Sequence, residues 1–205
     1  HGGGGPGSGP VGVVEKLEPF LPVPRVKKVD DRFELVEDHE FSIGRVHSFY
    51  GNFNVVLKAY TYIRALGSDG LKAVSEWAML NANYMKEKLK VHFNLPYDRI
   101  CAHEFVIDDS KMPHHITTND IAKRLLDYGF HPPTVYFPLI VKGAMMIEPT
   151  ETESIEAMDS FIDAMVKIKQ EAKDNPAFLK SAPYNTPVKR LDGVMAARNP
   201  CSEMV

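Results

Sequence analysis

Apolar residues recur every three or four positions in four stretches of the chain, a spacing that places them on one face of an α-helix. These stretches are residues 52–66, 71–89, 117–128 and 150–168. Gly67 follows the first stretch, at the position after a helix end where glycine readily takes a positive φ. At the helical spacing of the second stretch, Asn81 lies on the same face as the apolar residues. The pattern therefore predicts four helices, one of which carries a polar side chain on its apolar face.

Shorter apolar runs predict strands, two of which form a hairpin near the start of the chain. The predicted strands are residues 25–29, 33–36, 101–107, 135–141 and 144–147. Pro19, Pro22 and Pro24 precede the hairpin, and we expect an extended segment there because proline disfavours a helix. After residue 174 the periodicity ends, which indicates a tail that lies along a surface. The order of these elements predicts an α/β fold in which helices cover one side of a small sheet.

The composition of the 205 residues is that of an ordinary globular chain, with 44% hydrophobic and 25% charged residues. A net charge of −3 and the lack of a basic, aromatic-rich run argue against nucleic-acid binding. No apolar run approaches the roughly 20 residues that span a bilayer, so we expect no membrane segment. Cys101 and Cys201 lack the spacing of a zinc site or a disulfide framework, which favours a reducing, cytoplasmic compartment and no bound metal.

The first ten residues contain six glycines and two prolines and precede every predicted element. Ordering such a run costs roughly 1–2 kcal/mol per residue, and the run has almost no apolar surface to bury. We therefore expect it to dock against a segment upstream of His1, which would make the chain the later part of a longer protein. Its backbone N–H groups could bind an anion. However, the lysine of a Walker A loop and the strand and helix of a dinucleotide site are absent.

Two histidines are candidates for a pocket. His103 lies in an apolar run, where the second histidine of a helical zinc-protease motif is absent. Its ring could be hydrogen-bonded inside a core, the common state of buried polar groups, or it could line a pocket. His131 lies at a turn that two following prolines stiffen, where it is part of either a helix stop or a pocket wall. The residues leave both pairs of alternatives open.

Three carboxylates and two threonine hydroxyls are concentrated in residues 148–153, where a predicted strand gives way to a predicted helix. Acidic groups and threonine oxygens stabilise the N-terminus of a helix, both electrostatically and as caps. Paired carboxylates can also catalyse hydrolysis, but the sequence offers no matching nucleophile. Helix capping is therefore the interpretation that these residues favour.

Several segments together resemble one known family. They are His1–Gly12, Leu80–Tyr84, Ala102–Phe105, Ala122–His131 and Glu148–Glu153. Each is similar to a segment in the C-terminal part of the pyridoxal-phosphate-dependent glycine decarboxylase, the P-protein of the glycine cleavage system. The similarity extends to about Asp192, and residues 186–192 resemble the end of subunit 2 in the bacterial two-subunit form of that enzyme.

This resemblance implies fold type I of the pyridoxal-phosphate enzymes, the aspartate aminotransferase-like fold. Residues 1–50 would then end the large cofactor domain, residues 51–173 would form a helical connection and a small α/β domain, and residues 174–205 would form a tail. In the family, the lysine that bonds to the cofactor precedes the glycine-rich run, and no lysine of this chain has that context. We therefore expect no catalytic residue within the chain and no activity of the chain alone.

The family activity that the resemblance implies is an oxidoreductase reaction of glycine catabolism. Glycine loses CO2, and its aminomethyl group passes to the lipoyl arm of the carrier H-protein. The resemblance also implies a partner, subunit 1, in a heterotetramer. The residues that it places at the rim of the cofactor site are His1, Gly2, Gly3, Gly4, Gly5 and Ser8, and its pocket candidates are His103 and His131. A non-catalytic module of the same fold, serving oligomerisation or carrier docking, is the alternative.

Overall fold

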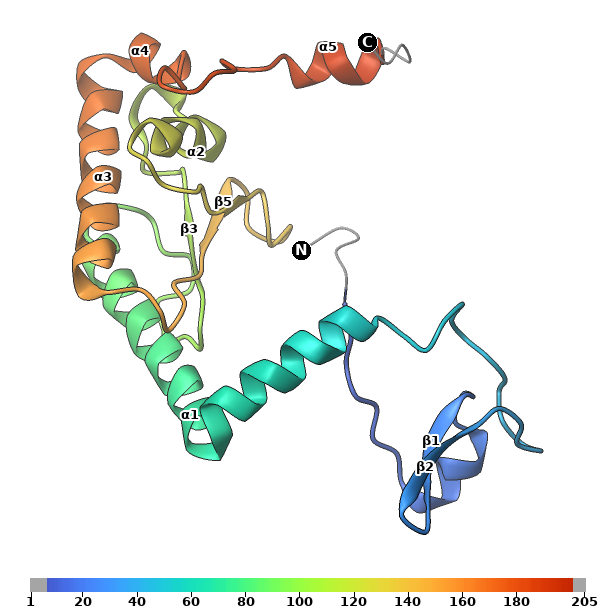
Figure 1. The fold of residues 1–205 in the computed structure, drawn as a ribbon. Helices are drawn as coiled ribbons and strands as arrows, with labels where there is room; N and C mark the ends of the chain where they lie inside the picture. The colour runs from blue at the N-terminus through green and yellow to red at the C-terminus, as the bar shows by residue number, and fades with distance from the viewer. Residues whose placement is uncertain (1–6, 201–205) are drawn as a thin grey trace. The chain divides into compact units, whose positions relative to one another are not determined.

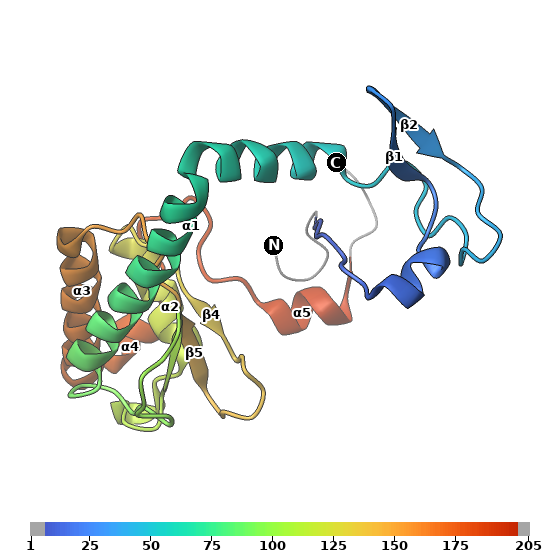
Figure 2. The same cartoon turned by 90° about the horizontal axis from the view of Figure 1, so that it is seen from below.

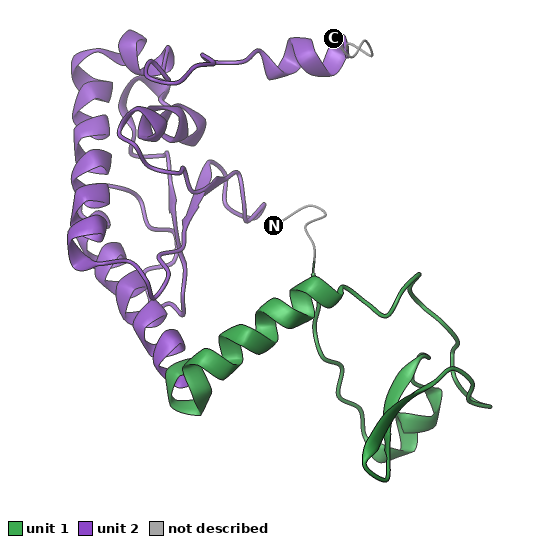
Figure 3. Ribbon diagram, in the orientation of Figure 1, with its two compact units in different colours: residues 1–71 green, residues 72–205 purple. Residues whose placement is uncertain are grey.

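The structure, a computed structural model, describes residues 7–200 and divides the chain into two compact units. Unit 1 is His1–Leu71 and unit 2 is Lys72–Val205 (Figure 3). Within the described residues, no helix is long and apolar enough to cross a membrane. The two units differ in how much apolar surface each buries.

Unit 1 contains a two-stranded hairpin of β1 (Arg25–Val29) and β2 (Arg32–Val36) (Figure 1). The antiparallel register pairs Val29 with Arg32, so that two residues form the turn. Asp30, the first of these, has a φ of 53°, a conformation that aspartate tolerates better than most residues. The predicted hairpin is therefore confirmed, and its second strand begins one residue earlier than expected.

A short 3-10 helix, η1 (Glu15–Phe20), precedes the hairpin and contains Pro19. The expectation of an extended segment is wrong at this point. The turn is closed by the N–H groups of Leu17 and Leu21, each of which donates to the carbonyl three residues earlier. Proline lacks an N–H, but at position 19 it removes neither of these two hydrogen bonds.

Unit 1 buries almost no apolar surface of its own. Among its described hydrophobic residues Val23 alone is buried, whereas Phe33 of the hairpin is 73% exposed. Further exposed apolar residues are Val11, Val26, Ile43, Phe49, Phe53, Tyr60 and Ile63. An isolated two-stranded hairpin is at best marginally stable in water. Unit 1 therefore depends on apolar contacts beyond those that it makes within itself.

Helix α1 (Phe53–Leu89) is interrupted at Gly67, whose φ of 65° and ψ of −174° are not helical. The two predicted helices are thus confirmed as two parts of one element, with the break at the predicted glycine. Asn81, in the second part, is buried as its place on the apolar face predicts. Its Nδ2 donates to the carbonyl oxygen of Thr150 at 2.9 Å, which gives the buried amide a partner.

Unit 2 is built on an antiparallel three-stranded sheet. Its strands, in spatial order, are β3 (Phe105–Asp108), β5 (Ala144–Ile147) and β4 (Thr134–Val135). Residues paired across an antiparallel ladder share a face, and successive residues alternate between faces. The register pairs Phe105 with Ile147 and Ile107 with Met145, and all four side chains are buried. One face of the sheet is therefore apolar and lies against the core.

Five further helical elements lie in the part of unit 2 that the structure describes. They are η2 (Pro113–His115), α2 (Thr118–Asp127), α3 (Ile155–Asp174), α4 (Pro176–Lys180) and α5 (Gly193–Arg198). Figures 1 and 2 show α3 and the unit 2 part of α1 on the same side of the sheet. One buried cluster joins Leu89 of α1, Leu125 of α2 and Met165 of α3 to the apolar face of the sheet. The predicted α/β arrangement, with helices on one side of a small sheet, is confirmed.

Helix α2 begins with a capping box. The Thr117 hydroxyl accepts the backbone N–H of Asp120 at 3.3 Å, and the Asp120 carboxylate accepts the N–H of Thr117 at 2.9 Å. Gly129, two residues after the last helical residue, has a φ of 83°. Both ends of this helix therefore follow from local sequence chemistry.

Three predicted boundaries are wrong. Strand β3 begins only at Phe105, because the N–H of Cys101 donates to Asn83 Oδ1 of α1 rather than to a neighbouring strand. Strand β4 ends before Tyr136, whose φ of 58° is incompatible with a strand. Helix α3 begins after Ser154, not at Thr150, because the Ser154 hydroxyl accepts the N–H of Ala157 and caps the helix.

Replacing Leu125 by alanine should lower the free energy of unfolding by about 2–5 kcal/mol, because this fully buried side chain leaves a cavity in the core of unit 2. Phe33→Ala is the matched control, since the ring is mostly exposed and its loss should change the free energy by about 0.5 kcal/mol or less. Urea unfolding followed by circular dichroism measures both. Equal losses in the two variants would contradict the assignment of the core to unit 2.

Candidate functional site

The residues that the sequence singles out in unit 2 meet at the C-terminal end of β5. Glu148 follows the last residue of this strand, and two cavities lie beside it. One cavity has a volume of about 360 Å³ and includes His131 and Glu148 in its lining. The other has a volume of about 350 Å³ and includes His103 and the same Glu148. A single carboxylate therefore borders both cavities, with one candidate histidine in each.

His103 lies in the loop before β3, and its side chain is 55% exposed. Its Nε2 is 3.6 Å from Glu148 Oε1 and 3.9 Å from Glu104 Oε2. The ring is therefore not enclosed in the core, so that the core alternative is wrong for this histidine. His103 Nε2 therefore lies beside the cavity, within reach of two carboxylates.

The glycine-rich run lies mostly outside the described residues. This applies to His1, Gly2, Gly3, Gly4 and Gly5. Ser8 is described, is exposed and belongs to unit 1. The rim of the expected cofactor site therefore stays a prediction.

The two cavities do not fit pyridoxal phosphate by themselves. This cofactor needs a lysine amine for its covalent bond and cationic or N–H groups for its phosphate. The lining of both cavities contains no lysine or arginine and includes three glutamates. The described residues also contain no group of three or more His, Cys, Asp or Glu side chains that could hold a metal ion. The chemistry that the cavities offer is proton binding and the attraction of cations.

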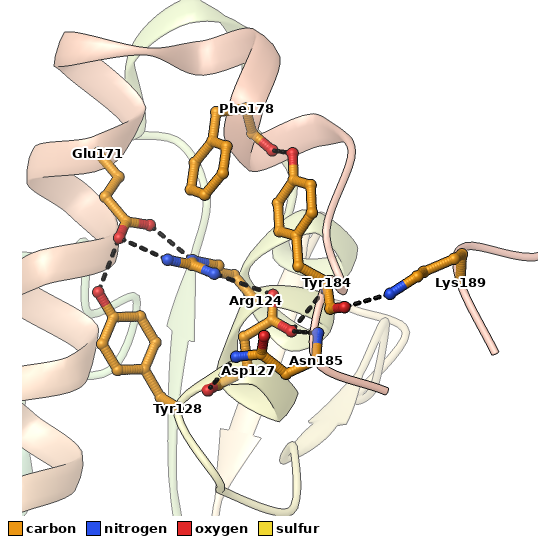
Figure 4. Close-up of polar contacts among 8 residues, drawn as sticks. All are labelled: Arg124, Asp127, Tyr128, Glu171, Phe178, Tyr184, Asn185 and Lys189. Carbon is orange, nitrogen blue, oxygen red and sulfur yellow. Dashed lines mark hydrogen bonds and ion pairs between the residues drawn. The ribbon is translucent and has the colours of Figure 1, made fainter. Parts of the chain in front are cut away.

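A second polar cluster, which sequence reasoning missed, is centred on Arg124 of α2 (Figure 4). Arg124 Nε and Nη2 donate to the two carboxylate oxygens of Glu171 on α3, at 2.8 and 2.9 Å. Nη1 donates to Asp127 at 2.9 Å, and the Tyr128 hydroxyl donates to Glu171 at 2.7 Å. Such a bidentate pair fixes the orientation of both groups. The cluster therefore joins α2 to α3 outside the apolar core.

The same cluster holds the chain after α4, which we call the strap (residues 181–190). Asp127 Oδ1 accepts the backbone N–H groups of Tyr184 at 2.6 Å and Asn185 at 2.7 Å (Figure 4). The Tyr184 ring stacks on Phe178 with centroids 4.5 Å apart. At the other end of the strap, Arg190 donates to Asp120 at 2.6 Å. The predicted tail thus lies along a surface, and its attachment depends on acidic residues of α2.

Burial and hydrogen bonding act in opposite directions on the acids of this cluster. Partial burial pushes the pKa of Glu171 upward, but hydrogen bonds from Arg124 and Tyr128 outweigh it and leave the pKa below its usual value. Burial likewise raises the pKa of Asp127, and the N–H of Asn185 and the guanidinium of Arg124 lower it further than burial raises it. Both carboxyl groups are therefore ionised in the folded state at neutral pH.

The sequence held one signal for this cluster, which is the spacing of Arg124 and Asp127. Residues three apart lie on the same side of a helix and can form an ion pair. Their partners, Glu171 and the strap, come from segments more than 40 residues away. No local pattern connects these segments, so only the tertiary structure reveals the cluster.

Comparison with known proteins gives consistent matches along the chain. The family model described as "Glycine dehydrogenase, C-terminal domain" matches residues 74–185. A protein of Caldanaerobacter subterraneus subsp. tengcongensis, described as "Probable glycine dehydrogenase (decarboxylating) subunit 2", is 60% identical over 201 residues, which are 98% of this chain and 41% of that protein. A protein of Fervidobacterium nodosum with the same description is 58% identical over 202 residues, 98% of this chain and 42% of its own length. The chain thus spans about two fifths of these relatives.

A solved structure shows the same fold. It is a crystal structure of glycine decarboxylase (P-protein) of the glycine cleavage system in inhibitor-bound form, with a TM-score of 0.61 and 18% sequence identity. The match covers 75% of this chain and 37% of that chain. At this identity the likeness concerns the fold, and it agrees with the α/β architecture of unit 2.

Removing the Asp127 carboxylate should free the strap. In Asp127→Ala, the amides of Tyr184 and Asn185 lose a charge-assisted acceptor that contributes about 1.5–3 kcal/mol, so they should exchange with solvent at least about 10-fold faster. Hydrogen exchange followed by mass spectrometry measures this rate. Asp163→Ala, an exposed acid on α3, is the matched control and should leave the rate unchanged. Unchanged exchange in Asp127→Ala would show that the strap is held by other contacts.

Unit 2 should lose stability in acid. The folded pKa values of Asp127 and Glu171 lie below their ordinary values of 3.8 and 4.5, so both groups contribute fully above these values. The contribution is lost as the pH falls through the folded values. Urea unfolding between pH 6 and pH 3 should show this decrease. Glu171→Gln should show a smaller decrease, and a decrease of the same size in the variant would contradict the role of this pair.

Proposed function

Because the chain belongs to the family of the glycine dehydrogenase C-terminal domain, we propose that it is the C-terminal part of subunit 2 of a bacterial glycine dehydrogenase (decarboxylating). The main support for this proposal is the sequence identity of 60% and 58% to two proteins described as subunit 2, over 98% of this chain. The TM-score of 0.61 to a glycine decarboxylase supports the same fold, and the quoted motifs at Ala102–Phe105 and Glu148–Glu153 lie at the candidate site. The substrate that follows from this proposal is glycine.

The proposed reaction is the decarboxylation of glycine with transfer of its aminomethyl group to the lipoyl arm of the H-protein. In the intact enzyme, bound pyridoxal phosphate would supply an electron sink. The cavities of unit 2 lack a lysine, so no bond to the cofactor is assigned to their residues. We assign to this chain the tasks of orienting groups and holding protons. Residues 1–5 and Ser8 are proposed as the rim of the cofactor site on the sequence resemblance alone.

We propose a role in proton transfer for His103 of unit 2. Its Nε2 lies within 4 Å of two carboxylates and beside a cavity, and its side chain is accessible. A group so placed can hold a proton near the reacting amine or carboxylate and release it again. His131 lines the neighbouring cavity, and we propose that it forms part of the wall that excludes water.

The partners that we propose are the rest of subunit 2 and subunit 1, in a heterotetramer. The part of α1 before Gly67 exposes six apolar side chains, five of which recur at the spacing of one helix face. These are Phe53, Val56, Leu57, Tyr60, Tyr62 and Ile63. A contiguous exposed apolar face is typical of a surface that packs against another part of a protein. The apolar residues of unit 1 therefore support the proposal that this unit is covered in the complete enzyme.

We also propose a bacterial cytoplasmic location. The relatives named above are bacterial proteins, and Cys101 is a free thiol whose pKa is raised by burial. A thiol that is neither paired nor acidic is compatible with a reducing compartment.

The proposal is tested by a chimera that carries this chain in place of the matching segment of the Caldanaerobacter subunit 2, assembled with subunit 1. We expect it to release CO2 from glycine in the presence of H-protein, within about 10-fold of the parent rate. This corresponds to a barrier change of about 1.4 kcal/mol. A chimera that folds and assembles but releases no CO2 would instead indicate a non-catalytic module for oligomerisation or carrier docking.

Within this chimera, His103→Ala should lower the decarboxylation rate by about 100-fold, the lower end of the usual contribution of a general acid or base. The steady-state rate at saturating glycine measures the effect, and a change in the pH profile distinguishes it from a structural role. His115→Ala is the control, because this exposed ring lies outside both cavities at β5. Equal decarboxylation rates in the two variants would show that His103 has no part in the reaction.

A further inference from the structure

Flexible and aromatic apolar side chains line much of the cavity next to His131. Three methionines contribute to it, which are Met85, Met146 and Met158. Phe130 and Phe161 also line it and contact each other edge to face, with centroids 5.3 Å apart and an angle of 86°. Methionine side chains adapt to irregular shapes, and thioether sulfur is attracted to aromatic rings. Such walls fit a flexible aliphatic chain better than a rigid planar ligand.

The size of the cavity agrees with a small ligand. Its volume of about 360 Å³ lies at the lower end of the range of ligand pockets, roughly 300–1,000 Å³. Pro132, Pro133 and Pro149 form further parts of the lining and restrict its backbone. The pocket is therefore partly preformed, so that binding costs little backbone ordering.

The acidic side chains of the lining are two glutamates, one of which, Glu148, also lies 3.6 Å from His103 Nε2. Glu148 and Glu153 both contribute to the cavity, and no lysine or arginine does. His131 is the remaining titratable group of the lining. Electrostatic complementarity then favours a cation over a neutral group and disfavours an anion.

We propose that this cavity binds a flexible aliphatic chain that ends in a primary ammonium group. The methylene chain would lie against the methionine and phenylalanine side chains, and the ammonium would lie near Glu148 and Glu153. The apolar walls contribute affinity through buried area, and the carboxylates contribute selectivity for the cation. This inference concerns unit 2 and does not depend on the proposed enzymatic activity.

The test uses the 205-residue chain with methionine methyl groups labelled with ¹³C, titrated with n-hexylamine at pH 8. We expect the methyl signals of Met85, Met146 and Met158 to shift, while Met112 and Met165, which lie outside this cavity, stay in place. We expect 1-hexanol to bind at least about 3-fold more weakly and hexanoate to bind most weakly. The absence of shifts at the three lining methionines would overturn the proposal, as would equal binding of hexylamine and hexanol.

Two variants and a matched control distinguish the contribution of the apolar walls from that of the charge. Glu153→Gln should reduce the affinity for hexylamine about 3-fold or more and leave that for hexanol unchanged. Asp163→Asn makes the same change of charge on an exposed part of α3 and should alter neither affinity. Ala157→Phe, which places a ring in the lining, should abolish the binding of both probes. The unshifted Met165 signal reports that this variant is folded, and retained binding in it would place the ligand elsewhere and overturn the proposal.

Discussion

Burial of one face of the β3-β5-β4 sheet is the interaction on which the described part of unit 2 depends. The alternation along β3 and β5 places Phe105, Ile107, Met145 and Ile147 on the same face. The helices α1, α2 and α3 contribute the other half of this core. Because the sheet is so small, its strands have little stability without that cover. The cavities beside Glu148 exist because the strand and α1 are held at this edge of the core.

The polar cluster around Arg124 adds a second level of organisation. It connects α2 to α3 through a bidentate ion pair and then connects α2 to the strap through Asp127. Unit 1 shows the opposite situation, because its hairpin and the start of α1 leave their apolar side chains exposed. The chain thus combines a domain with a core of its own and a segment whose apolar side chains are mostly exposed. This division agrees with the proposal that the chain is part of a larger subunit in an assembly.

Much of the fold follows from local sequence chemistry, and what does not follow has a physical reason. The break at Gly67, the hairpin at residues 25–36 and the capping box of α2 were predictable because each depends on a few neighbouring residues. The burial of Asn81 followed from helical phase. The start of β3 did not follow from the sequence. The predicted strand begins at Cys101, but Asn83 of α1 forms hydrogen bonds with the backbone N–H and carbonyl of Cys101.

The candidate site could be predicted only in part. The sequence singled out His103, His131 and residues 148–153, and the structure places these at two cavities that share Glu148. The exposure of His103 and the Arg124 cluster could not be predicted from the sequence, because both depend on how distant segments pack. The glycine-rich run, the most distinctive motif of the sequence, lies mostly outside the described residues.

The central claim is that unit 2 has a core of its own and that unit 1 does not. Hydrogen exchange of the 205-residue chain, followed by mass spectrometry, tests it most directly. The account predicts that amides of β3, β5, α2 and α3 stay protected for minutes or longer, while those of residues 25–36 and 53–66 exchange within seconds. Protection of residues 25–36 and 53–66 equal to that of the sheet would contradict the account.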